Sequence, residues 1–578
     1  DHDAASGMRA DVYRAVRAVY SNADEMCQLG PEDRRLVEQV ELEFRRSGLL
    51  QPPDTRERLA AISRHLCDLE VAFNRCINES CTNVLFARSE LAGLPDDFFD
   101  GRATEVVGGV QKYVVTTKHR DYQLLLKYAR REATRRAMYV AEAAQCADNA
   151  RRLQEMVLLR LEEALLLGYK SHSHYVMETL MAQTPHAAID MLNNLRGLAT
   201  ELATRELTEL EELKAADMHE SKARDSRLCC WDKAYYARLA KERRHNVQED
   251  EVRQYFPLGR TTHRLLDIYE QMLGLRIVRV AGPPVWHPDV AAYEVWEADE
   301  VAFVGHFYLD LHPRANKYCH AAVWPIRPGF ERADGSREYP VVALVANFPA
   351  PTAAAPALLT HKNVVTLMHE LGHVFHGLCA RTKWSRFHGM RVERDFVEAP
   401  SQMLENWAWD PATLRSISSH YKTGEPIPDD LVARLVAAKN DGAGLATLCQ
   451  VFYALYDLAI HSTTDTDIDV VDAYHRMRSE MILLSDDTDT CRVAALRHLA
   501  GGYSSRLYGY LWADVFSADM FATRFKKEGV DNPETGRDYR NTILRPGGSR
   551  NAMESLVRFL GRPPNSKAFL GSLGLDSG

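Results

Sequence analysis

The sequence predicts a mainly α-helical protein of two subdomains with one small antiparallel β-sheet, and three observations support this fold class. The 578 residues exceed what one hydrophobic core usually organises, so two subdomains with a groove between them are expected. Up to residue 282 the apolar side chains recur mostly at three- and four-residue intervals, which is typical of amphipathic helices. β-branched and aromatic runs appear only after that point. We therefore predict a helical domain over residues 1–282 and a mixed domain over residues 283–578.

Helices account for most of the first half. The helical period is clearest at 124–167 and 187–213, and Thr184 with Pro185 forms a helix-start signal before the second of these segments. We expect these helices to form the walls and the core of the first domain.

The sheet is predicted from two segments, 293–311 and 339–348, which are rich in β-branched and aromatic residues. A turn at 334–336 separates them, so the pattern favours antiparallel pairing. Helices are expected to resume at about Lys362.

Composition excludes several classes of partner. A hydrophobic share of 46% and a charged share of 26% are ordinary for a globular protein. The net charge of −9 leaves no basic stripe that could neutralise a phosphate backbone, so nucleic acid is not an expected partner. The least charged long stretch, 341–359, contains Asn347 and three prolines and cannot form a membrane-spanning helix, so no membrane partner is expected.

Cysteine usage indicates a reducing compartment. The eleven cysteines are odd in number, Cys229 and Cys230 are neighbours, and no pair has the CxxC spacing. We expect reduced thiols and a cytoplasmic location. The sequence opens at Asp1 without a methionine or an apolar leader, so a targeting segment was either removed or never present; a removed presequence would make the mitochondrion the alternative.

The chemistry begins with His369-Glu370-Leu371-Gly372-His373. Two histidines at i and i+4 project from one helix face about 5 to 6 Å apart, which lets both rings reach one zinc ion. Glu370 is then placed to take a proton from a water molecule as a general base. The alternative is an amphipathic helix over 364–378 whose histidines bind no metal, because the pentapeptide also occurs by chance.

A zinc site needs a third ligand from another element, and the helix-like stretch 392–407 supplies the candidates. They are the carboxylates Glu393, Asp395, Glu398 and Glu405. The pattern alone does not choose among them, although Glu398 and Glu405 share a helix face at i and i+7. His361 and His376 remain as further possible ligands.

Six motifs occur along the chain: HELGHVFH at 369–376, ERDFVEAPSQMLENW at 393–407, GHFYLDL at 305–311, ANF at 346–348, HLAGGY at 498–503 and YGYLW at 508–512. With these motifs the sequence resembles the thimet oligopeptidase and neurolysin family of zinc metallopeptidases. The similarity covers nearly the whole chain.

The resemblance implies that His369, His373 and Glu398 hold one Zn²⁺ and that Glu370 is the general base. It also implies an elongated zincin of two subdomains, with a deep substrate channel, zinc on the channel floor and the small sheet beside the zinc-binding helix. The expected activity is that of an endopeptidase that hydrolyses short unstructured peptides and excludes folded proteins. A monomer is expected.

The resemblance further assigns the segment after His498. His498, Tyr503 and Tyr510 match positions that surround the substrate carbonyl, where a phenol or imidazole N–H would donate to the oxyanion as charge develops. Gly501 and Gly502 would keep this loop mobile enough to close on a peptide. The expected substrate-binding residues are Gly501, Gly502, Tyr503, Arg506 and Tyr510. Leu507 departs from the family, which has a tyrosine there.

The strand at 341–348 should offer its edge to an extended peptide, which suits broad specificity. His172-Ser173-His174 has the wrong spacing for two ligands on one helix face and is expected on the surface without a chemical role. Alternatives to a general oligopeptidase are a processing peptidase of the mitochondrial intermediate type, an enzyme dedicated to one precursor, and a catalytically silent peptide-binding protein, against which the intact Glu370 argues.

Overall fold

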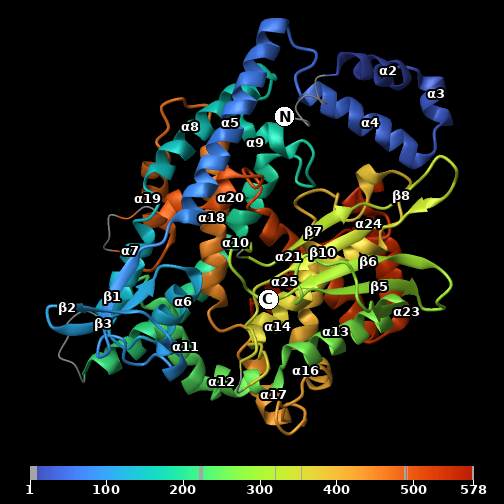
Figure 1. Ribbon diagram of the computed structural model, residues 1–578. Coiled ribbons are helices and arrows are strands. Elements are labelled where there is room, and N and C mark those ends of the chain that lie inside the picture. The colour runs from blue at the N-terminus through green and yellow to red at the C-terminus, as the bar shows by residue number, and fades with distance from the viewer. Residues whose placement is uncertain are drawn as a thin grey trace.

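The computed structural model describes residues 9–219, 226–318, 320–352, 355–486, 490 and 492–575. It confirms the mainly helical class (Figure 1). The helices before residue 274 are α2 (Ala10–Tyr20), α3 (Ala23–Gln28), α4 (Pro31–Arg46), α5 (Pro53–Glu79), α6 (His119–Tyr128), α7 (Glu132–Ala143), α8 (Asp148–Leu166), α9 (His172–Met177), α10 (Pro185–His219), α11 (Lys233–His245), α12 (Glu249–Val252) and α13 (Leu258–Leu273).

The second half has its own helices and most of the strands. The helices are α14 (His361–Cys379), α15 (Ala399–Glu405), α16 (Pro411–Ile417), α17 (Asp429–Ala437), α18 (Ala443–Ser462), α19 (Val470–Met481), α20 (Arg497–Ala500), α21 (Gly509–Met520), α22 (Lys526–Glu528), α23 (Pro533–Tyr539), α24 (Ala552–Leu560) and α25 (Lys567–Ser572). The strands are β1 (Asn83–Ala87), β2 (Thr104–Val107), β3 (Val110–Thr116), β4 (Leu275–Arg279), β5 (Ala291–Glu297), β6 (Phe303–Asp310), β7 (Ala322–Arg327), β8 (Phe330–Glu331), β9 (Arg337–Glu338) and β10 (Val341–Val345).

The predicted helical segments are present. The segment 124–167 runs from α6 through α7 and α8, and 187–213 lies within α10, which begins at the predicted Pro185. The first half also contains an antiparallel sheet that was not predicted from the sequence, with strand order β1-β3-β2. Gly108 and Gly109, with φ of +60° and +79°, form the two-residue turn between β2 and β3. A Gly-Gly pair between valines is a hairpin signal, so this sheet could have been found.

The larger sheet has the strand order β4-β5-β6-β10-β7. β10 pairs with β7 in antiparallel fashion but with β6 in parallel, so the prediction of a purely antiparallel sheet is wrong. The chain reaches β7 before β10, and β10 then inserts between β6 and β7. β10 is therefore an interior strand, and the expectation that it offers an edge is also wrong; β4 and β7 are the edge strands of this sheet.

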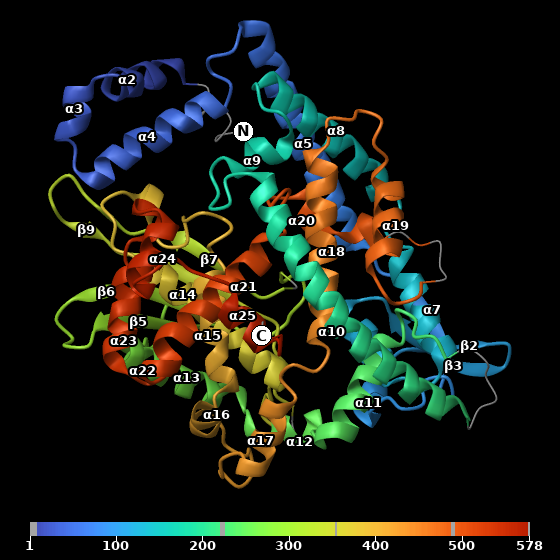
Figure 2. The same cartoon turned by 180° about the vertical axis from the view of Figure 1, so that it is seen from behind.

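The helices group in space differently from their order in the sequence. α18, α19 and α20 come from the second half of the chain but pack among α5, α8, α9 and α10 (Figures 1 and 2). We call this group the helical wall. One main hydrophobic core contains Phe73 and Leu153 from the wall as well as Phe307 of the larger sheet and Phe375 of α14. The boundary between residues 282 and 283 stays a prediction.

Helix α18 is long and apolar enough to span a membrane, with a mean hydropathy of 1.4. However, 67% of its most apolar window is buried inside the protein, against α10 and other wall helices. It also contains Asp457 and His461, both fully buried and hydrogen-bonded to each other. α18 thus has the packing of a core helix.

Helix α4 contacts both parts of the molecule. Near its C-terminal end, the Arg46 guanidinium donates to the backbone oxygen of Tyr175 and to Glu178 of the wall, each at 2.6 Å. Near its N-terminal end, Asp33 accepts from the Lys383 ammonium at 2.9 Å and from the Trp384 indole at 2.7 Å, just beyond α14. α4 therefore links the wall to the segment that follows α14.

The crossing of α10 and α18 depends on a glycine. A Cβ on Gly444 of α18 would lie 2.5 Å from the Ala203 nitrogen and 2.7 Å from the Leu202 carbonyl carbon, both backbone atoms of α10. We predict that Gly444→Ala lowers the free energy of unfolding by about 1–3 kcal/mol through overpacking. Gly197 of α10 is the matched control, because its Cβ would meet no atom within 4 Å; Gly197→Ala should stabilise by about 0.5–1 kcal/mol. Thermal denaturation of both variants measures this, and equal shifts would contradict it.

Candidate active site

Helix α14 presents the two histidines of the sequence motif. It begins with a capping box in which the Thr360 side chain accepts from the Asn363 N–H and the Asn363 side chain accepts from the Thr360 N–H. This places the start of the helix one residue from the prediction. One turn apart on this helix, the rings of His369 and His373 have centroids 4.8 Å from each other.

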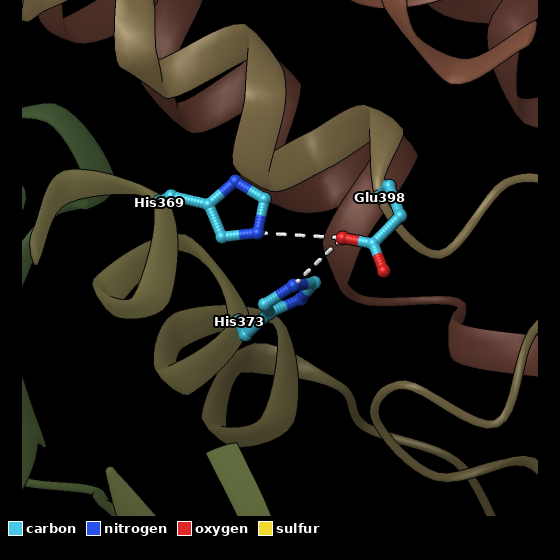
Figure 3. A group of neighbouring side chains, drawn as sticks. All are labelled: His369, His373 and Glu398. Atoms are coloured by element: carbon cyan, nitrogen blue, oxygen red, sulfur yellow. Dashed lines mark hydrogen bonds and ion pairs between the residues drawn. The ribbon is translucent and has the colours of Figure 1, made fainter. Parts of the chain in front are cut away.

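Glu398 meets both rings, as Figure 3 shows. Its Oε2 lies 3.3 Å from His369 Nε2 and 3.1 Å from His373 Nε2. Four ligands at 2.0–2.1 Å around a tetrahedral zinc ion are separated by roughly 3.3 Å, so these two distances fit zinc. The three side chains form a group whose ligand atoms lie within 4.8 Å of one another and which could hold a metal ion.

The segment before α15 is not the continuous helix predicted over 392–407. α15 begins only at Ala399, and Glu398 is its N-cap residue. A Cβ on Gly372 would lie 2.8 Å from the Ser401 Cα, so the absence of a side chain at Gly372 lets α15 pack directly on α14. This close packing brings Glu398 within reach of the histidines.

The other candidate ligands have different partners. Glu405 accepts from His369 Nδ1 at 2.8 Å, which turns His369 Nε2 toward Glu398. Glu393 pairs with Arg35 at 3.5 Å. His361 bonds the backbone oxygen of Ala408 at 2.7 Å.

The remaining candidates also lie outside the metal group. The Asp395 carboxylate accepts from the backbone N–H groups of Met181 and Ala182 and from the Tyr508 hydroxyl. His376 is fully buried next to the site, and burial together with the nearby His373 and His388 lowers its pKa to about 3.

The carboxylates of Glu398 and Glu405 stabilise positive charge at the two histidines, the place where a bound cation would lie. Burial by itself would lower the pKa of His369, but the hydrogen bonds to Glu398 and Glu405 outweigh burial and raise this pKa to about 10. Burial likewise opposes ionisation of Glu398, yet His369 and His373 hold the pKa of this carboxyl well below its usual range. A negative carboxylate facing two histidines is the donor set that zinc prefers in catalytic sites.

Glu370 lies beside the metal group and is buried, with 6% of its surface exposed. Burial raises the pKa of its carboxyl, which His369 and His373 partly offset. Its Oε2 is buried and accepts no hydrogen bond from the described residues. A carboxylate oxygen in this position is available to accept a proton from a water molecule.

His498, Tyr503 and Tyr510 come together on the other side of Glu398. The Tyr503 hydroxyl donates to Glu398 Oε1 at 3.2 Å. Its ring stacks on that of Tyr510, with centroids 5.5 Å apart and an interplanar angle of 12°. The His498 ring lies edge-on to both, at 5.4 and 6.2 Å. We call residues 497–510 the tyrosine loop.

Both phenols remain protonated donors. Burial raises the pKa of Tyr510 and of Tyr503, and the nearby Glu398 raises both further. Gly502 is exposed and a Cβ there would meet no atom within 4 Å, so this position is open toward solvent. The Arg506 guanidinium donates to the Gly502 backbone oxygen at 2.6 Å and so contacts its own loop.

The expectation for 172–174 is wrong for two of its three residues. His172 and Ser173 are buried, with 6% and 0% of their surface exposed. His172 Nε2 bonds the Ser504 hydroxyl at 3.0 Å, and the Ser173 and Ser505 hydroxyls lie 2.9 Å apart. No local signal predicts these contacts, because the partners are 332 residues away along the chain.

Solved structures share the fold of this chain. PZ peptidase A with inhibitor 2 superposes with a TM-score of 0.56 at 13% identity, covering 97% of this chain and 82% of that chain. The M32 carboxypeptidase from Deinococcus radiodurans R1 gives a TM-score of 0.54 at 14% identity, covering 99% and 88%. At such low identity these likenesses support the fold alone.

Sequence comparison is more specific. A thimet-like oligopeptidase from Dictyostelium discoideum is 36% identical over 99% of this chain and 86% of its own length. Saccharolysin from Saccharomyces cerevisiae is 34% identical over 99% and 82%, and oligopeptidase A from Escherichia coli is 31% identical over 98% and 85%. The model for peptidase family M3 matches residues 125–575. The chain is a metallo-oligopeptidase and belongs to peptidase family M3.

Proposed function

We propose that this oligopeptidase is a zinc-dependent endopeptidase that cuts short unstructured peptides. The observation that supports zinc is the spacing of Glu398 Oε2 from the two histidine nitrogens, 3.3 and 3.1 Å. Beside them lies Glu370, whose buried Oε2 accepts no hydrogen bond from the described part of the chain. His369, His373 and Glu398 would hold the ion.

A bound zinc ion would polarise the scissile carbonyl and lower the pKa of a water molecule toward about 7. Glu370 then accepts the proton of that water and passes it to the leaving amine. Its raised pKa suits this exchange, because a carboxyl whose pKa lies closer to neutrality gives up the proton less readily to solvent and can deliver it to the amine. The nucleophile is water, so no acyl-enzyme forms.

Tyr510 and His498 would donate to the oxyanion that develops on the scissile carbonyl. Tyr503 already donates to Glu398, so its main role is to orient that carboxylate and the ring of Tyr510. Gly501, Gly502 and Arg506 would contact the substrate main chain at the exposed part of the tyrosine loop.

The substrate would lie along β7. β7 is an edge strand of the larger sheet, contacts α14, and exposes Trp324 and Ile326. Pairing with an edge strand binds a peptide through its main chain without reading its side chains. We also propose that the enzyme acts as a monomer. It would admit only extended chains, a restriction that the burial of Glu370, His373 and Glu398 supports.

Glu370→Gln should retain zinc and fold but lose about 10²- to 10⁴-fold in kcat, because the amide keeps the shape and cannot accept a proton. Steady-state kinetics on a quenched fluorescent peptide measures this, with zinc content determined by atomic absorption. A zinc-loaded variant with the wild-type rate would show that Glu370 is not the general base.

Glu398→Ala should weaken zinc binding more than about 100-fold, because loss of a direct ligand costs more than loss of an outer partner. Glu393→Ala is the matched control, since the Glu393 side chain lies on the same segment, is 10% exposed against 11% for Glu398, and pairs with Arg35. Zinc retained after dialysis against a chelator measures both variants. Equal zinc retention in the two would mean that another residue is the third ligand.

Substrate size provides a separate test. A short peptide copied from one strand of a small stable domain should be cut at least about 100-fold faster than the folded domain, which must first spend several kcal/mol on local unfolding. Mass spectrometry of both digests gives the rates. If the folded domain is cleaved as fast as its peptide, access to the site is not restricted.

A further inference from the structure

The tyrosine loop is fixed at two places by buried side chains of the helical wall. The first is Arg160 of α8, whose guanidinium donates to the backbone oxygens of Leu499 at 2.7 Å and Ala500 at 2.9 Å. Arg160 is 6% exposed, so both bonds are shielded from water. The chain just after His498 is therefore held to the wall.

The second place lies just beyond Tyr503. The Asp457 carboxylate of α18 accepts from the Ser505 N–H at 2.8 Å and from the Leu507 N–H at 3.1 Å, one with each oxygen. Asp457 and Ser505 are fully buried. Ser505 has a φ of +58°, a conformation that costs energy for a residue with a side chain and persists only where its surroundings impose it. The carboxylate of Asp457 supplies that constraint.

A histidine joins the two places into one network. Arg160 Nη1 lies 3.1 Å from His461 Nε2, and His461 Nδ1 lies 2.9 Å from Asp457 Oδ1. A guanidinium can only donate, so Nε2 accepts and Nδ1 carries the proton that His461 donates to Asp457. Helix α9 adds two further bonds to the loop, from His172 to Ser504 and between the hydroxyls of Ser173 and Ser505.

Four residues, Gly501 to Ser504, lie between the two fixed places, and Ser504 is itself bonded to His172 of the wall. Any mobility of the loop is confined to this short piece, which contains the phenol that bonds Glu398. After the second fixed place, the Tyr508 hydroxyl donates to Asp395 at 2.7 Å, so α21, which begins at Gly509 and contains Tyr510, starts from a fixed position. The wall and Asp395 together thus determine where the two tyrosines lie relative to the metal group.

We propose that Asp457 is a positioning residue for the peptidase reaction: it holds the Ser505 and Leu507 amides so that Tyr503 and Tyr510 stand against the metal group. This inference rests on the proposed oxyanion role of Tyr510. Asp457 itself acts through the loop and does not contact the substrate.

Asp457→Asn provides the main test, because the amide keeps one acceptor oxygen and loses the second. We expect kcat to fall about tenfold or more, with KM changed less than about threefold and zinc content unchanged. The reason is that misplaced donors reduce the stabilisation of the transition state and leave substrate binding nearly unchanged. Amide hydrogen exchange across 499–508 should become faster. Unchanged exchange in a folded Asp457→Asn variant would overturn the positioning role.

Asp232→Asn is the matched control. Asp232 is also a fully buried carboxylate, held by Arg135 and Lys214, and none of its described hydrogen bonds reaches the tyrosine loop. It should lower the melting temperature and leave kcat unchanged within about twofold, because the protein keeps its donors in place. An equal loss of kcat in both variants would show that general destabilisation, and not positioning, explains the effect.

Combination with Tyr510→Phe separates this inference from the function on which it rests. Tyr510→Phe should cut kcat by about 10²- to 10³-fold. If Asp457 acts through Tyr510, then Asp457→Asn should lower kcat less than about threefold further in that background. Fully additive effects would overturn the inference, whereas a wild-type kcat in Tyr510→Phe alone would remove the oxyanion role.

Ser173→Ala keeps the test open if Asp457→Asn does not fold. It removes one hydroxyl contact to Ser505 and should give faster exchange at 499–508 with a fall of a few-fold in kcat. Wild-type exchange and kcat in this variant would count against the network as the element that positions the loop.

Discussion

The direct packing of α15 on α14 at Gly372 is the contact on which the active site depends. Any side chain at that position would meet the backbone of α15 at 2.8 Å. With glycine there, Glu398, the N-cap residue of α15, reaches both histidines. Glu405, at the other end of the same short helix, accepts from His369 Nδ1. The metal group, Glu405 and the proposed general base Glu370 therefore all lie at one helix–helix contact.

The parts of the site that the sequence could predict are those fixed by local geometry or by family motifs. The i, i+4 spacing of His369 and His373 follows from one helix, whereas the choice of Glu398 over Glu405 needed the resemblance. The order of the strands could not be predicted from the sequence. The apolar residues of β10 indicate that this strand is buried, but they do not indicate which strands lie beside it. The role of His172 and Ser173 depends on partners in a distant segment, and periodicity contains no such information.

The two sets of side chains proposed to take part in the reaction come from different parts of the molecule. His369, His373, Glu370 and Glu398 belong to α14 and the start of α15, while the tyrosine loop is held by α8, α9 and α18 of the wall. The Tyr508–Asp395 and Tyr503–Glu398 bonds connect the two. A shift of the wall against the larger sheet would change the geometry of the reaction without altering any ligand of the metal.

Helix α4 connects the wall to the part of the molecule that contains the metal group. Its 16 residues form a rod about 24 Å long, attached to the wall through Arg46 and to the segment after α14 through Asp33. The Arg46 side chain is 11% exposed, but the Lys383 partner of Asp33 is 44% exposed, so dissolved salt screens the outer attachment more than the inner one. Helix α4 is therefore a rigid connection between the two parts, and its attachment at Asp33 weakens before its attachment at Arg46 as ionic strength rises.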